Sequence, residues 1–204
     1  MALAGLAVVG LAALLAGYYL ALDRPEETAK PAAAAASRVP ELRPDFSLQD
    51  SDGTVRSITE WDGRALVINF WATWCPPCRR EIPLLNALRK EYAPQGFEVI
   101  GVAVDFRDDV IAYMAETPID YPMLIGEQDG LDAARAFGME TMGFPFTVFT
   151  DSRARIVTVH VGELHRSQAE VILTAVADVD AGRLDIETAR SQIRAAMASL
   201  KAPG

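Results

Sequence analysis

The chain has few of the residue types from which metal and cofactor sites are usually built. Its 204 residues include two cysteines, Cys75 and Cys78, and two histidines, His160 and His165. A zinc site usually takes four such ligands, so both pairs would have to converge from about eighty residues apart in sequence. The sequence also lacks the G-x-G-x-x-G fingerprint of dinucleotide-binding folds. We therefore predict neither a metal site nor a cofactor.

Positive charge is scarce as well. The 19 Lys and Arg residues against 28 Asp and Glu residues give a net charge of −9 at pH 7. This balance argues against nucleic acid or anionic lipid as a partner of the soluble part. The acidic residues between Asp105 and Asp109 lack the spacing and the glycine of an EF-hand loop, and we interpret them as the start of a helix.

No charged residue occurs in residues 2–22, which are predominantly apolar. As a helix these 21 residues would extend about 31 Å, enough to cross the hydrocarbon core of a bilayer. A cleaved signal peptide would have a basic n-region and a shorter apolar stretch, and neither is present. Residues 1–22 are therefore predicted to be an uncleaved transmembrane anchor. Cleavage further on, within the alanine tract 32–36, is the alternative.

The two cysteines lie together in Cys75-Pro76-Pro77-Cys78, between a predicted strand and a predicted helix. The continuous apolar run Ala65–Trp71 predicts a buried strand. The helical spacing of the apolar residues that follow the motif predicts a helix, in which they are Ile82, Leu85, Leu88 and Tyr92. Cys75 is then the N-cap of this helix, and Cys78 lies one turn inside it.

A helix N-terminus favours a thiolate, because its N–H groups are unpaired and carry the positive end of the macrodipole. We therefore predict that Cys75 is the exposed nucleophile and that Cys78 resolves the mixed disulfide. Pro76 fits the first helical position, whereas Pro77 removes the next amide and leaves the Cys78 N–H as the nearest backbone donor. These features favour a reducing pair.

Two other uses of a C-x-x-C pair stay open at this point. The pair could be half of a zinc site completed by His160 and His165. It could also be an inert structural disulfide, although closing so short a loop removes little entropy from the unfolded chain.

Residues 69–83, Asn-Phe-Trp-Ala-Thr-Trp-Cys-Pro-Pro-Cys-Arg-Arg-Glu-Ile-Pro, resemble the active-site signature of the thioredoxin superfamily. They are most similar to its membrane-anchored TlpA/ResA-like branch, the thiol–disulfide reductases of the bacterial cell envelope. The resemblance covers about residues 42–177, with residues 43–53 similar to the N-terminal hairpin and residues 143–147 to the cis-proline loop. It implies an α/β thioredoxin-like fold, a central mixed sheet flanked by helices, with that hairpin and a central helix–strand insertion in residues 108–125.

The same resemblance implies that Pro145 is the cis-proline facing the disulfide. Phe144 would then line the groove that binds the client protein, and Trp74 and Pro76 would complete the rim of the site. Without the resemblance, Pro145 would be interpreted as an ordinary trans proline, because a cis peptide bond is uncommon even before proline.

Asn69 occupies the strand position at which cytosolic thioredoxins carry a buried aspartate that accepts a proton. Since asparagine does not titrate, proton exchange with Cys78 requires another group. Glu81, three residues further along nearly the same helical face, is the candidate, and it matches a glutamate of the TlpA/ResA-like reductases. The alternative is a first-turn glutamate beside Arg79 and Arg80 that only complements the helix dipole.

The predicted function is that of a thiol–disulfide oxidoreductase that reduces disulfides of envelope client proteins. The resemblance implies cytochrome c maturation or copper-site assembly as its purpose, with electrons from a thiol–disulfide transporter in the membrane.

One alternative is a thiol peroxidase, whose relatives carry Thr-x-x-Cys, whereas Thr73 lies only two residues before Cys75. Another is a Cu(I) metallochaperone, since thiolates are soft ligands, although such carriers use C-x-x-x-C and a histidine. A purely structural anchor protein would not need this cysteine pair.

These arguments divide the chain into an anchor (1–22), an Ala/Pro-rich linker (23–41), a thioredoxin-like domain (42–180) and a helical extension (181–204). The acidic flank after residue 22 favours export of the domain by the positive-inside rule. We predict a single-pass protein of the bacterial inner membrane with its catalytic domain in the periplasm.

In the extension, Asp185 is placed to cap an amphipathic helix. This helix either packs on its own domain or binds a partner or a second copy.

Overall fold

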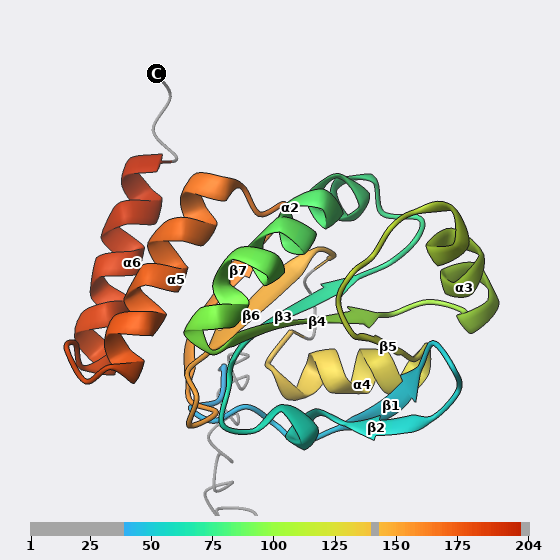
Figure 1. Ribbon diagram of the computed structural model, residues 1–204, viewed down its shortest axis with the longest axis horizontal. Coiled ribbons are helices and arrows are strands. Elements are labelled where there is room, and N and C mark those ends of the chain that lie inside the picture. Colours follow the sequence, from blue (N-terminus) through green and yellow to red (C-terminus); the bar gives the residue numbers. More distant parts are fainter. Residues whose placement is uncertain (1–38, 140–142, 201–204) are drawn as a thin grey trace, which may run out of the picture. The chain divides into compact units, whose positions relative to one another are not determined.

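The computed structural model describes residues 39–139 and 143–200 (Figure 1). The predicted transmembrane anchor and residues 23–38 of the predicted linker lie outside these ranges. Within them, no helix combines the length and the apolar character needed to cross a membrane.

The described residues form a seven-stranded mixed sheet with the strand order β2-β1-β5-β4-β3-β6-β7. Neighbouring strands run parallel in the pairs β3–β4 and β4–β5 and antiparallel in the other pairs. This is the predicted α/β fold with a mixed central sheet. The strands are β1 (Ser47–Asp50), β2 (Val55–Ser57), β3 (Ala65–Trp71), β4 (Phe97–Ala103), β5 (Met123–Ile125), β6 (Phe146–Thr150) and β7 (Ile156–Val161).

Helices cover both faces of this sheet (Figure 1). All seven residues of β3 are buried, and its alternate side chains enter two different apolar clusters, as the pleat of a strand dictates. One cluster joins Val67 and Trp71 to α2, α3, α5 and α6, and the other joins Ile68 and Phe70 to α4. The helices are α2 (Pro76–Tyr92), α3 (Arg107–Glu116), α4 (Gln128–Ala136), α5 (Arg166–Asp180) and α6 (Ile186–Leu200), with short 3₁₀ turns η1 (Ile58–Trp61) and η2 (Ala93–Gln95).

Two features implied by the family resemblance are present. β1 and β2 form an antiparallel hairpin at the start of the domain, and α3 with β5 forms the helix–strand insertion. β5 pairs with β4 on one side and with β1 on the other. The insertion therefore joins the hairpin to β4, the parallel neighbour of the strand β3 that leads into the cysteine motif.

Helix α6 follows the domain and packs on it. The Thr188 N–H donates to Asp185 Oδ1 at 2.9 Å, so Asp185 caps the helix as the sequence indicated. Ala189 and Ile193 are buried in the same apolar cluster as the inner face of α5.

The aromatic core beneath the active-site strand provides a test of the packing. Phe70 is fully buried, stacks on Phe146 at a centroid distance of 4.4 Å and contacts the edge of Phe137 at 5.5 Å. Phe70→Ala should therefore lower the free energy of unfolding by about 3–5 kcal/mol, measured by urea denaturation. Val55→Ala, at a side chain that is 66% exposed, is the control and should stay within about 0.5 kcal/mol. Equal effects of the two changes would contradict this packing.

Candidate functional site

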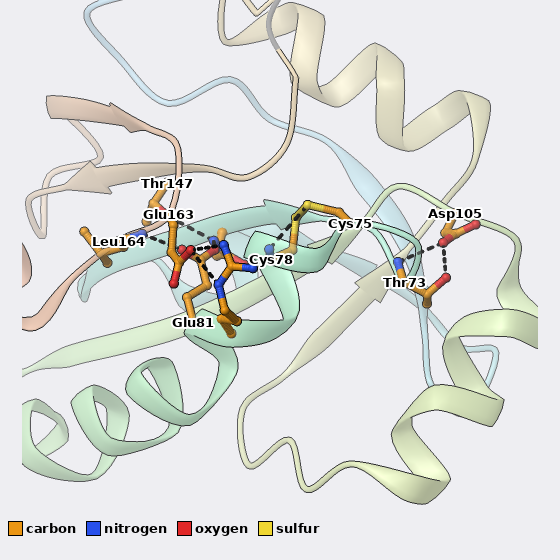
Figure 2. The surroundings of a disulfide bond; sticks show 10 residues. Thr73, Cys75, Cys78, Glu81, Asp105, Thr147, Glu163 and Leu164 are labelled. Carbon is orange, nitrogen blue, oxygen red and sulfur yellow. Dashed lines mark hydrogen bonds and ion pairs between the residues drawn. A yellow bond between two sulfur atoms is a disulfide. The ribbon is translucent and has the colours of Figure 1, made fainter.

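The cysteine motif lies where β3 gives way to α2. Cys75 is the N-cap of α2, and Pro76 and Pro77 are its first two residues, where no N–H is required. The Cys78 N–H donates to Cys75 Sγ at 3.3 Å, which is the donor that the sequence indicated. The two cysteines form a disulfide (Figure 2).

Cys75 is less accessible than predicted. The residue is only 3% exposed and Cys78 is fully buried, so the prediction of an exposed Cys75 is wrong for the disulfide form. The physical reason is that the Cys75 sulfur turns toward Cys78, into the apolar cluster that also holds Trp71. Trp74, the residue before Cys75, is 65% exposed.

Glu81 is a buried carboxylate that links three parts of the fold (Figure 2). It lies on α2 and is 1% exposed. Asn69 Nδ2 of β3 donates to Glu81 Oε1 at 2.7 Å, and the Leu164 N–H, between β7 and α5, donates to Oε2 at 2.7 Å. Asn69 Nδ2 also donates to Thr147 Oγ1 on β6 at 3.0 Å.

The alternative interpretation of Glu81, a first-turn glutamate beside Arg79 and Arg80 that only complements the helix dipole, is wrong, because the first turn of α2 contains no acidic residue and Glu81 is buried. Burial places its carboxylate inside the domain, and Arg80 instead pairs with Glu163 at 2.5 Å on the surface.

Burial also sets the protonation of this group. Loss of hydration raises the pKa of Glu81 to about 7, although the hydrogen bonds from Leu164 and Asn69 act in the opposite direction. The negative charge of Glu163 raises this pKa further, by a smaller amount. A carboxyl group with this pKa can both accept and donate a proton near neutral pH, and it lies on nearly the same helical face as Cys78.

Four residues were predicted to bind the client, and they differ in exposure. Phe144 is half-buried and its ring centroid lies 6.1 Å from that of Trp74, so these two side chains are brought together. The Phe144–Pro145 peptide bond is cis, and Pro145 is buried. Pro76 is exposed at the start of α2.

The sequence analysis missed the pairing of Thr73 with Asp105. Asp105 Oδ2 accepts hydrogen bonds from Thr73 N at 2.9 Å and from Thr73 Oγ1 at 2.5 Å, and Oδ1 accepts one from the Phe106 N–H at 2.9 Å. Asp105 was interpreted as part of a helix start, but α3 begins at Arg107. A signal was present: both residues lie two positions beyond the ends of parallel neighbours, β3 and β4, whose carboxyl ends share one edge of the sheet.

The described residues do not assemble a metal site. No group of three or more His, Cys, Asp or Glu side chains in these ranges is arranged to hold an ion. The zinc and copper alternatives both required histidine to join Cys75 and Cys78. Instead, His160 Nε2 lies 3.2 Å from the Glu163 carbonyl oxygen.

Comparison with known proteins gives consistent matches. The sequence model of the Redoxin family matches residues 37–175. The thiol-disulfide oxidoreductase ResA of Halalkalibacterium halodurans is 30% identical over 141 residues, 69% of this chain and 78% of that protein. The thioredoxin-like protein YneN of Bacillus subtilis is 34% identical over 133 residues, 62% of this chain and 74% of that protein. A thiol:disulfide interchange protein of the thioredoxin family from Chlorobium tepidum TLS has a solved structure with a TM-score of 0.60. It is 31% identical and covers 68% of this chain and 97% of its own.

The raised pKa of Glu81 predicts how the stability of the oxidised protein depends on pH. The folded state holds the Glu81 proton up to a pKa of about 7, whereas a glutamate in the unfolded chain has its ordinary pKa of 4.5. The stabilisation is therefore complete below the unfolded pKa and is lost as the pH rises through 7. Relative to Glu81→Gln, the wild type should lose up to about 3 kcal/mol of unfolding free energy between about pH 5 and pH 8.

Urea denaturation across this pH range measures the difference. Glu163→Gln is the matched control and should keep the pH dependence, because burial rather than the Glu163 charge is the larger cause of the raised pKa. A wild type and a Glu81→Gln variant with parallel stability curves would contradict the assignment.

Proposed function

This chain belongs to the Redoxin family and is a TlpA/ResA-like thiol–disulfide oxidoreductase with a Cys75–Cys78 pair, and from that premise we propose that it reduces disulfides of client proteins in the cell envelope. The observation that carries the proposal is the buried Glu81 carboxyl group. It lies one turn after Cys78, and its pKa of about 7 suits proton exchange with a thiol at neutral pH.

The proposed reaction transfers two electrons and two protons to the client. The Cys75 thiolate attacks one sulfur of the client disulfide, forms the mixed disulfide and releases the other client sulfur, which takes up a proton. Cys78 then loses its proton to Glu81 and attacks the Cys75 sulfur. The Cys75–Cys78 disulfide closes, and the first client sulfur leaves and is protonated. A second dithiol, which we propose belongs to a thiol–disulfide transporter in the membrane, must return the enzyme to its reduced form.

The surroundings of Cys75 support reduction as the preferred direction. An oxidising pair is one whose nucleophilic thiolate is strongly stabilised. Among the described residues, the Cys78 N–H is the one hydrogen-bond donor to Cys75 Sγ, because Pro76 and Pro77 have no N–H to donate. A measured midpoint near −120 mV, the value of a strong oxidant, would argue against this direction.

The client would dock beside the cis bond, across Phe144 and Pro145, with Trp74 and Pro76 completing the rim. The exposure of Trp74 and its contact with Phe144 support this placement. The client would reach the buried sulfur pair along this aromatic rim.

We further propose the cellular setting that the sequence indicates. Residues 1–22 would anchor the protein in the bacterial inner membrane and place the catalytic domain in the periplasm. The purpose would be cytochrome c maturation or assembly of a copper site. The uncharged apolar stretch 2–22 and the single cysteine pair support this setting.

The role of Glu81 is tested by the pH dependence of client reduction. The wild-type rate should show a titration near pH 7, and Glu81→Gln should lack it and react about 10²-fold more slowly, because general acid–base catalysis typically contributes that much. Stopped-flow measurement of the reduced protein with a disulfide-containing peptide gives both profiles. Glu81→Asp keeps a titratable carboxyl group and should keep a pH-dependent step. An unchanged profile in Glu81→Gln would remove Glu81 from the mechanism.

The function itself is tested by trapping clients in the native host. Cys78→Ala leaves Cys75 without its resolving thiol, so mixed disulfides with clients should accumulate, to be identified by mass spectrometry after non-reducing electrophoresis. The double change Cys75→Ala, Cys78→Ala is the control and should trap nothing. A trapped cytochrome c precursor or copper-site protein would identify the pathway, and an empty trap would contradict protein disulfide reduction.

A further inference from the structure

Two aromatic side chains are exposed in the part of the chain that the structure describes. Trp74 is 65% exposed and Phe106 is 60% exposed, whereas the other aromatic side chains in these ranges are buried or half-buried. Their loops are tied together, because Trp74 follows Thr73 and Phe106 follows Asp105, and the Asp105 carboxylate accepts hydrogen bonds from both loops. The two rings therefore stand at one edge of the sheet, beyond the ends of β3 and β4.

Phe106 lies outside the client groove described above. Trp74 contacts Phe144 on one side, and the Asp105 bridge connects its loop to Phe106. Figure 2 shows that Thr73 and Asp105 lie on the opposite side of the disulfide from Glu81. The Phe106 ring is therefore an exposed apolar side chain next to a buried carboxylate that accepts hydrogen bonds at both oxygens.

The surface around Phe106 carries excess negative charge. Four nearby carboxylates make no ion pair and no side-chain hydrogen bond with described residues, namely those of Asp108, Asp109, Glu127 and Asp129. We call Phe106 with these four residues the Phe106 patch. Glu127, Asp129 and Phe106 line a hollow of about 270 Å³ together with Arg107. The Arg107 guanidinium is directed to the backbone, where it donates to the Ser51 carbonyl oxygen at 2.6 Å.

We propose that the Phe106 patch is a second docking site for the client, and that it binds an extended client segment with a lysine or arginine next to an apolar side chain. The apolar part would pack on the Phe106 ring while the cationic group faces the carboxylates and the ring. Acidic segments are disfavoured there by like charge. This inference rests on the proposed function and specifies its substrate class.

The position of the patch sets where the client must carry this segment. Phe106 is next to Asp105, which binds Thr73, two residues before Cys75. An extended chain advances about 3.3 Å per residue, and we place the docking segment within about five residues of the attacked cysteine.

The test uses the reduced full-length chain in detergent and three peptides of equal length, each closed by one disulfide. Each peptide has two variable positions within five residues of one cysteine. These positions hold lysine and leucine in the first peptide, glutamate and leucine in the second, and two serines in the third. A neutral small disulfide, bis(2-hydroxyethyl) disulfide, reports on the redox chemistry alone. In every case the products are two client thiols and the Cys75–Cys78 disulfide, so electrons and protons balance. The second-order rate constant is measured for each substrate.

At low salt the lysine peptide should react about tenfold faster than the glutamate peptide, because charge complementarity raises the association rate. About 0.5 M salt should reduce this ratio to about twofold by screening. Glu127→Gln with Asp129→Asn should lower the ratio in the same way. Phe106→Ser should lower the rate constant of the lysine peptide, relative to that of the small disulfide, about fivefold, by removing the apolar contact.

Matched controls separate the patch from general effects. Glu91→Gln with Glu170→Gln changes the net charge by the same amount at Arg166, on α2 and α5. Glu91 lies 16 residues along from Cys75, about 24 Å at the helical rise, so the peptide ratio should not change. Leu42→Ser removes an equally exposed apolar side chain, at a residue that pairs with Arg155 and does not line the hollow beside Phe106, and should leave the rate constant of the lysine peptide, relative to that of the small disulfide, unchanged.

Each outcome has one consequence. Reduction of the small disulfide with equal rates for all peptides, or a faster glutamate peptide, would overturn the docking inference and leave the proposed function intact. A charge preference that the Glu91 and Glu170 control removes as strongly would also overturn it. Failure to reduce any of the disulfides would overturn the proposed function and this inference with it.

Discussion

The burial of the Glu81 carboxyl group is the interaction on which the site depends. A buried carboxylate is stable only when its oxygens accept hydrogen bonds, and here one donor comes from Asn69 on β3 and the other from the Leu164 N–H between β7 and α5. These bonds hold the first turns of α2 against the sheet and against the loop before α5. The same burial raises the pKa of Glu81 to about 7. One constraint thus positions the cysteine helix and supplies a group that exchanges protons at neutral pH.

Asn69 is the necessary partner of this arrangement. The strand β3 is buried along its whole length, so a polar side chain within it must find partners inside the fold. Asn69 lies opposite Thr147 in the antiparallel register of β3 and β6, and its amide donates to both Thr147 and Glu81. An aspartate at this position would place two carboxylates in contact, and like charges at that distance cannot both ionise. A neutral donor in the strand and a titratable acceptor on the helix therefore form a consistent pair.

The parts of this fold that could be predicted from sequence are those encoded locally. The apolar run of β3, the spacing of apolar residues in α2 and the cysteines between them specify a strand, a helix and a redox pair from about thirty consecutive residues. The contacts of Leu164 with Glu81 and of Asp105 with Thr73 join residues 83 and 32 positions apart, and no spacing in the chain marks such partners. The prediction that Cys75 is exposed was wrong for a related reason. It depends on the direction of the sulfur, which the Cys78 partner determines in the disulfide.

The two buried carboxylates beside the disulfide have different surroundings, and these give them different tasks. Asp105 accepts three hydrogen bonds, two from backbone amides, and so fixes the loops that present Trp74 and Phe106. Glu81 accepts two, and loss of hydration on burial raises its pKa to about 7, which leaves it free to change charge near neutral pH. Because they lie on opposite sides of the sulfur pair (Figure 2), the proton chemistry and the client-facing surface rest on separate supports. Separate supports allow the client-facing residues to vary in sequence without disturbing the chemistry of the cysteines, since energetic coupling between sites without shared partners is weak.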